Sequence, residues 1–188
     1  MMQAKITRTD LLIAIVVAVS VAFFGLFSTD KLPLLPTSVN ACGIYCEMAL
    51  NYDKMLMHQD FDRYYFQKSL LSFFVHGVML AGDIEKSTLT INYILEIISA
   101  VLLVASAAIW FFIAQSNSFS RSAYWIAVMG MFLCQIFVKI VPYAQESPDT
   151  AAFFFGMLSL YAVTCKREGW ILPIMIATLF VQPQLTIF

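Results

Sequence analysis

The segment Tyr93–Ala114, YILEIISAVLLVASAAIWFFIA, decides the class of fold because its 22 positions hold a single charged residue, Glu96. A run of about 20 apolar residues is long enough for a helix to cross the roughly 30 Å hydrocarbon core of a bilayer. Around it, 61% of the 188 residues are hydrophobic and only 12% are charged. Soluble domains are about 25% charged, so the composition indicates an integral membrane protein. A net charge of −1 leaves no basic field that would bind nucleic acid.

Four more apolar runs lie outside this segment, and together they predict a bundle of five transmembrane helices. The first is preceded by a short basic head but lacks a small-residue cleavage site after it, so we interpret it as an uncleaved span. The four runs are Leu11–Phe27, Tyr124–Val141, Ala151–Thr164 and Trp170–Phe188. We therefore expect an all-α fold with one transmembrane domain over residues 1–188.

The segment Ser69–Gly82 is apolar but short for a span, and charge placement decides how it is read. If it does not cross, the basic turns at Arg121 and at Lys166-Arg167 share the cytoplasmic side with the N-terminus, as the positive-inside rule favours. If it crosses, both turns lie outside. We expect an interfacial or re-entrant helix here, which leaves residues 28–90 as one large external loop and residues 91–188 as four further spans.

This external loop holds seven of the twelve acidic residues, whereas the other connections are short. Residues 39–51 predict a short helix, and a polar break at His58–Asp62 separates it from a second helix that begins near Asp62 and runs into Ser69–Gly82. The break alternates possible metal ligands, so a divalent cation is one option and an ordinary polar turn is the other. Cys42 and Cys46 are one helical turn apart, a spacing that we expect to leave them unbridged on a regular helix.

Three stretches resemble the N-terminal half of the multi-spanning GT-C type glycosyltransferases, bacterial membrane enzymes that use polyprenyl-phosphate-linked sugars. The first is Cys42-Gly43-Ile44-Tyr45 with Met48-Ala49, and the second is Phe61-Asp62-Arg63-Tyr64-Tyr65-Phe66-Gln67-Lys68-Ser69-Leu70-Leu71. The third is Ser147-Pro148-Asp149-Thr150-Ala151 with the two spans and the basic turn that follow it. The resemblance implies that the protein binds a polyprenyl-phosphate sugar at the outer face of a bacterial inner membrane. The charge placement predicts an N-terminus in the cytoplasm.

Such a transfer needs a carboxylate that deprotonates the acceptor hydroxyl and cations that hold the departing phosphate. The candidate bases in the external loop are Asp53, Asp60 and Asp62, with Glu47 next, and the candidate phosphate ligands are Lys54, Arg63 and Lys68. Each acidic residue also fits a solvated loop position.

Two polar residues lie inside apolar segments. Glu96 is one turn inside its span, where a carboxylate marks either a structural contact or a functional site. His76 lies on the apolar Ser69–Gly82 helix, where we expect a hydrogen bond within the bundle rather than a proton shuttle.

Two departures from the resemblance keep a second function open. Cys42 stands where the family places its catalytic carboxylate, and a thiol with a usual pKa near 8.5 is a poor base toward a sugar hydroxyl. The family's enzymes also continue through further spans. The alternative is a non-catalytic membrane subunit, or a truncated relative, that acts in assembly with a membrane protein partner.

Overall fold

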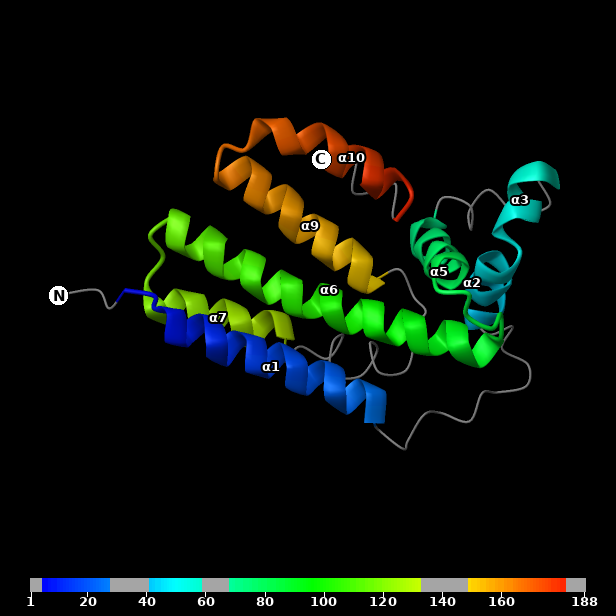
Figure 1. Ribbon diagram of the computed structural model, residues 1–188. Coiled ribbons are helices and arrows are strands. Elements are labelled where there is room, and N and C mark those ends of the chain that lie inside the picture. The colour runs from blue at the N-terminus through cyan, green and yellow to red at the C-terminus, as the bar shows by residue number, and fades with distance from the viewer. Residues whose placement is uncertain (1–4, 28–40, 59–67, 133–148, 182–188) are drawn as a thin grey trace.

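The computed structural model describes residues 5–27, 41–58, 68–132 and 149–181, and every regular element in these ranges is a helix. The prediction of an all-α fold is confirmed. The helices, labelled as in Figure 1, are α1 (Arg8–Phe27), α2 (Ala41–Leu50), α3 (Tyr52–His58), α5 (Leu70–Ala81), α6 (Thr88–Ser116), α7 (Arg121–Phe132), α9 (Asp149–Thr164), the 3-10 turn η2 (Glu168–Trp170) and α10 (Ile171–Leu179).

Helix α6 is the axis of the molecule (Figure 1), with α1 and α7 along one side and α9 and α10 along the other. It begins where the Ser87 side chain accepts a hydrogen bond from the backbone N–H of Thr90 at 3.2 Å, which satisfies one of the free donors of the first turn. At its other end, the side-chain amide of Asn117 donates to the Ile113 carbonyl at 2.8 Å, and Ser118 turns the chain at a φ of 54°.

Small residues let α1 approach α6 closely. Ala14, Ala18 and Ala22 recur every fourth position, so they lie on one face of α1, and all three are buried. They share a core cluster with Leu103 and Ala107 of α6. Close contact between small side chains is the usual way in which helices associate where no hydrophobic effect operates between them.

Within the described ranges, Thr90–Ser116 is the one helical stretch long and apolar enough to cross a membrane. Three other apolar helices, Leu70–Ala81, Asp149–Thr164 and Glu168–Leu179, are shorter. The predicted span Tyr93–Ala114 therefore lies within a helix of sufficient length, and the five-span bundle stays a prediction.

The helices of the segment predicted to be an external loop, residues 28–90, gather at the N-terminal end of α6 in the described ranges (Figure 1). The helix predicted over residues 39–51 is present as α2, and α3 follows it directly and continues to His58. The predicted helix start near Asp62 lies outside the described residues. The described part of that helix, α5, begins after Ser69. The backbone N–H of Leu70 donates to the Phe180 carbonyl at 3.0 Å, so the start of α5 also adjoins the end of α10.

Cys46 is disulfide-bonded, with a partner outside the side chains that the structure describes. The expectation that Cys42 and Cys46 are not bridged to each other stays a prediction.

Candidate functional site

Helix α5 carries a row of polar side chains on an otherwise apolar element. Ser69, Ser72 and His76 lie within two helical turns on the same side, and all three are buried. Buried polar groups need partners, and these find them on α2 and α3. The Ser72 hydroxyl donates to the Tyr45 carbonyl at 3.1 Å, and the Ser69 hydroxyl lies 3.4 Å from the Tyr52 hydroxyl.

His76 joins α2 to α3 through its two ring nitrogens. Its Nδ1 lies 2.7 Å from the carbonyl oxygen of Ala49, and its Nε2 lies 3.2 Å from Oδ2 of Asp53. A carbonyl oxygen only accepts, so Nδ1 is the donor in the first contact. The second contact joins Nε2 to a carboxylate oxygen of Asp53, so both ring nitrogens of the buried His76 have partners.

Asp53 brings this pair to the surface. The side chain of Asp53 is 65% exposed, whereas that of His76 is only 5% exposed. The ring of Tyr52, the residue before Asp53, lies 5.4 Å from the Phe73 ring and 6.0 Å from the His76 ring, centroid to centroid, and so anchors the first turn of α3 on α5. The result is an accessible carboxylate that is held from below by a buried imidazole.

Three of the remaining nominated residues lie on or next to the helices that carry this pair. Lys54 follows Asp53 and is exposed, and Glu47 is exposed on α2. Lys68 is partly buried and directly precedes Ser69. The hydroxyl of Ser69 contacts that of Tyr52 in the first turn of α3. Asp60, Asp62 and Arg63 lie outside the described residues, as do residues 59–62 of the suggested cation-binding break.

Glu96 is nearly buried on α6, consistent with its place inside an apolar segment. The expected hydrogen bonding of His76 within the bundle is confirmed by its contacts to Ala49 and Asp53. Among the described side chains, no three His, Cys, Asp or Glu residues come together as a metal site.

A second polar cluster, at the opposite end of the bundle, has as its centre a residue that the sequence reasoning missed. Asp10 is fully buried. Its Oδ1 accepts from Nε of Arg121 at 2.8 Å and from Nε1 of Trp125 at 3.0 Å. Its Oδ2 accepts from the backbone N–H and the hydroxyl of Thr7 at 2.9 and 2.8 Å.

These contacts determine the charge of Asp10, which precedes the apolar run of α1. Burial by itself would raise the pKa of the carboxyl, but the hydrogen bonds from Thr7, Arg121 and Trp125 together lower it to about 2. A sequence signal was present, because Thr7 and Asp10 have the spacing of a capping box at the start of α1. The ion pair also puts the N-terminus of α1 and the α6–α7 turn at one end of the bundle, as the charge pattern predicts.

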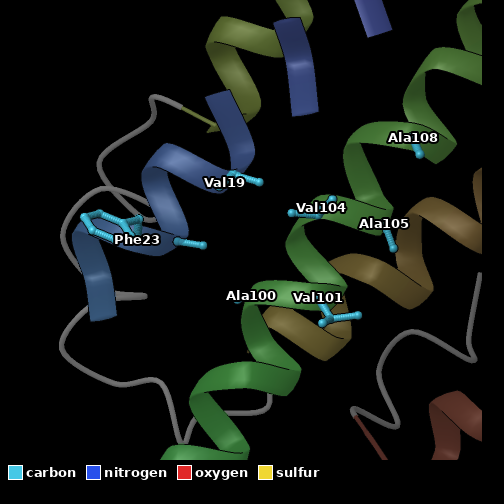
Figure 2. Close-up of a pocket in the computed structure, with 8 residues that line it drawn as sticks. Val19, Phe23, Ala100, Val101, Val104, Ala105 and Ala108 are labelled. Atoms are coloured by element: carbon cyan, nitrogen blue, oxygen red, sulfur yellow. The ribbon is translucent and has the colours of Figure 1, made fainter. Parts of the chain in front are cut away.

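An apolar groove runs between α1 and α6 on the side of the bundle (Figure 2). Its volume is about 440 Å³, within the range of small-molecule sites. Only carbon atoms line it. On the α6 side, three of the lining residues are alanines, whose short side chains leave room for the groove. The lining residues are Val19, Ala22, Phe23, Ala100, Val101, Val104, Ala105 and Ala108.

Comparisons with known proteins add no assignment. No family model matches the chain, and no curated protein or solved structure matches it either. The features of the molecule that bear on function are the Asp53–His76 pair, the groove and the arrangement of the helices.

Proposed function

We propose that the protein is a glycosyltransferase-like membrane protein that binds a lipid-phosphate-linked sugar at the external face, for transfer to a cell-envelope glycan or lipid. The observation that carries this proposal is the exposed carboxylate of Asp53, held by the buried His76 at the end of the bundle where α6 begins. An acceptor hydroxyl can reach Asp53 from outside, while His76 restricts the rotation of the carboxylate.

The chemistry assigned to this site is a substitution at the anomeric carbon of the sugar. The acceptor oxygen forms a bond to that carbon as the bond from the carbon to the phosphate oxygen breaks. The electron pair of the broken bond leaves with the lipid phosphate, and the proton of the acceptor hydroxyl passes to Asp53. Lys54 and Lys68 are the described cations closest in sequence to this site, and their charge would stabilise the departing phosphate.

The lipid part of the proposal is supported by the groove between α1 and α6. A purely apolar groove that opens on the side of a candidate span suits a hydrocarbon chain and offers nothing to a polar ligand. A polyprenyl chain in the groove and a sugar phosphate near Asp53 are the two halves of one carrier molecule.

The membrane placement belongs to the same proposal. We assign five spans, a cytoplasmic N-terminus and an external α2–α3–α5 segment in a bacterial inner membrane. The Asp10–Arg121 pair supports this topology, because it places the start of α1 and the start of α7 at the same end of the bundle. The chain therefore runs to the opposite end along α1 and comes back along α6. The disulfide at Cys46 suits an oxidising external compartment.

The second candidate is a non-catalytic subunit that holds the lipid carrier for a membrane protein partner. It is favoured by Cys42, which offers no carboxylate where the resemblance implies one. It differs from the first candidate in one measurable respect, because binding of the carrier would occur without transfer.

The test uses the full chain in lipid nanodiscs, with undecaprenyl phosphate as the binding probe and a radiolabelled undecaprenyl-phosphate hexose as the donor. Asp53→Asn is compared with Glu85→Gln, a matched loss of one exposed charge in the link between α5 and α6. We expect Asp53→Asn to lower transfer by roughly 10²–10⁴-fold, the usual contribution of a general base, while carrier binding stays unchanged. Glu85→Gln should leave both unchanged.

The outcomes separate the candidates. Carrier binding without transfer by the unmodified protein supports the subunit. Transfer that is equally retained in Asp53→Asn and Glu85→Gln refutes the role of Asp53, and the absence of carrier binding refutes both candidates.

A further inference from the structure

The two faces of α5 differ in what covers them, although both are largely apolar. One face, which includes Leu71, Val75 and Met79, is buried. The other presents large apolar side chains that are about half exposed: Phe73 and Phe74 are 50% and 52% exposed, and Leu80 is 56% exposed. Large apolar side chains on both faces of a helix need an apolar environment on both sides. Exposure of the outward face of α5 to water is therefore unfavourable, and this face needs an apolar partner.

The packing of the buried face sets the depth of α5 relative to α6. Leu71, Val75 and Met79 share a core cluster with Ile91 and Leu95. These two residues lie within the first six positions of the candidate span Thr90–Ser116, which corresponds to about 8 Å of helix rise. Helices that lie in the membrane surface bury their apolar face by about 5–10 Å at the boundary of headgroups and acyl chains. Helix α5 is attached to α6 at that depth.

The charged residues near α5 lie at its two ends. Its 12 residues contain no Asp, Glu, Lys or Arg. Lys68 precedes it, and Asp83, Glu85 and Lys86 follow it within five residues. A helix of this length extends about 18 Å, too short to cross about 30 Å of hydrocarbon. Apolar residues along the whole helix and charges at both ends fit a helix that lies along the membrane surface.

We propose that the face of α5 formed by Phe73, Phe74, Val78 and Leu80 is inserted into the acyl chains of the outer leaflet. The occupant is lipid rather than a second protein, because the opposite face of α5 packs against the start of the candidate span, which places α5 at the depth of the acyl-chain boundary. The opposite face carries His76, so insertion of α5 holds the Asp53–His76 pair at headgroup level. The insertion itself does not depend on the proposed sugar transfer.

Photolabelling from within the bilayer tests this proposal on the unmodified protein. The full chain is reconstituted in phosphatidylethanolamine–phosphatidylglycerol liposomes that contain a phosphatidylcholine with a diazirine in one acyl chain, and adducts are located by mass spectrometry. Ile97 of α6, 59% exposed, is the positive control for the lipid-facing side of a span. Met57 of α3, 77% exposed, is the matched negative control, because α3 lies beyond α2 and α5 from the bundle (Figure 1).

We expect adducts on Phe73, Phe74 or Leu80 at a yield like that of Ile97, and a yield at Met57 at least about tenfold lower, since α3 would lie outside the acyl-chain region. Replacement of Phe74 by Asp should reduce labelling of α5 but not of Ile97. Labelling of α5 as weak as that of Met57 would overturn the proposal. If weak labelling is joined by crosslinks between two copies through α5, a second copy covers this face. Since no sugar lipid is present, the result is independent of the transfer assay.

Discussion

Replacing Asp10 by Asn tests whether the buried carboxylate holds the N-terminus of α1 against α7. Asp10 offers two acceptor oxygens, one side to Thr7 and the other to Arg121 and Trp125. Asn offers one oxygen and one NH₂ donor. If its oxygen keeps Arg121 and Trp125, its NH₂ group faces the backbone N–H of Thr7, and that hydrogen bond is lost.

The expected loss of stability follows from these contacts. A hydrogen bond to a charged group contributes about 1.5–3 kcal/mol. Asp10→Asn removes one such bond and weakens the pairing with Arg121, whose side chain is half exposed and can turn to water. The net cost is about 2–3 kcal/mol, which lowers the melting temperature of a chain of this size by roughly 5–10 °C.

The assay is thermal unfolding in detergent, followed by circular dichroism, with Asp83→Asn as the control. Asp83 is exposed and has a φ of 47°, a conformation that Asn tolerates well. This control should change stability by less than about 0.5 kcal/mol. An Asp10→Asn variant that melts with the Asp83→Asn control would refute the argument.

The pH dependence gives a second check on the same variant. The pKa of Asp10 is lowered from 3.8 to about 2 in the folded protein. A lowered pKa means that the carboxylate stabilises the fold above pH 3.8, and that this contribution is lost as the pH falls through about 2. The difference between the unmodified protein and Asp10→Asn should therefore shrink in strong acid, and a difference that is constant with pH would contradict the assignment.

Two further predictions concern the Asp53–His76 pair and the groove. His76→Ala removes both the contact to Ala49 and the contact to Asp53. Hydrogen exchange followed by mass spectrometry should then show the backbone amides of α3 exchanging at least about tenfold faster, the equivalent of about 1.4 kcal/mol. Unchanged exchange would show that His76 does not hold α3 in place. Ala105→Trp fills the groove and should weaken binding of undecaprenyl phosphate by about tenfold or more. The control Ile126→Trp, on the exposed face of α7, should have no effect on this binding. Equal binding by both variants would rule out the groove as the lipid site.

Much of the local structure could be predicted from sequence patterns. Alternation between apolar runs and short polar turns predicted helices at Leu11–Phe27, Tyr93–Ala114 and Ala151–Thr164, and each lies within or nearly matches a helix of the structure. The helix boundaries between residues 41 and 81 were harder to predict. There α2 and α3 are short, and helices of this length depend on packing, here against α5, for their stability.

In the candidate site too, single residues could be predicted from the sequence but the contacts between them could not. Asp53 and His76 were each nominated, but as separate features, one in a polar loop and one in an apolar helix. They are 23 positions apart, and their 3.2 Å contact depends on how α3 packs against α5. Asp10 was missed because it stands next to an apolar run and its partner Arg121 is 111 positions away.

Composition and periodicity by themselves determined that this chain is helical, apolar and suited to a membrane, since burial of apolar residues and helix geometry are properties of each segment. They also indicated which end of the bundle carries the acidic residues. Only the tertiary structure decided which polar groups meet. A buried carboxylate, carbonyl or imidazole takes whichever partner the packing of helices brings within hydrogen-bonding distance, and for His76 and Asp10 those partners come from other helices.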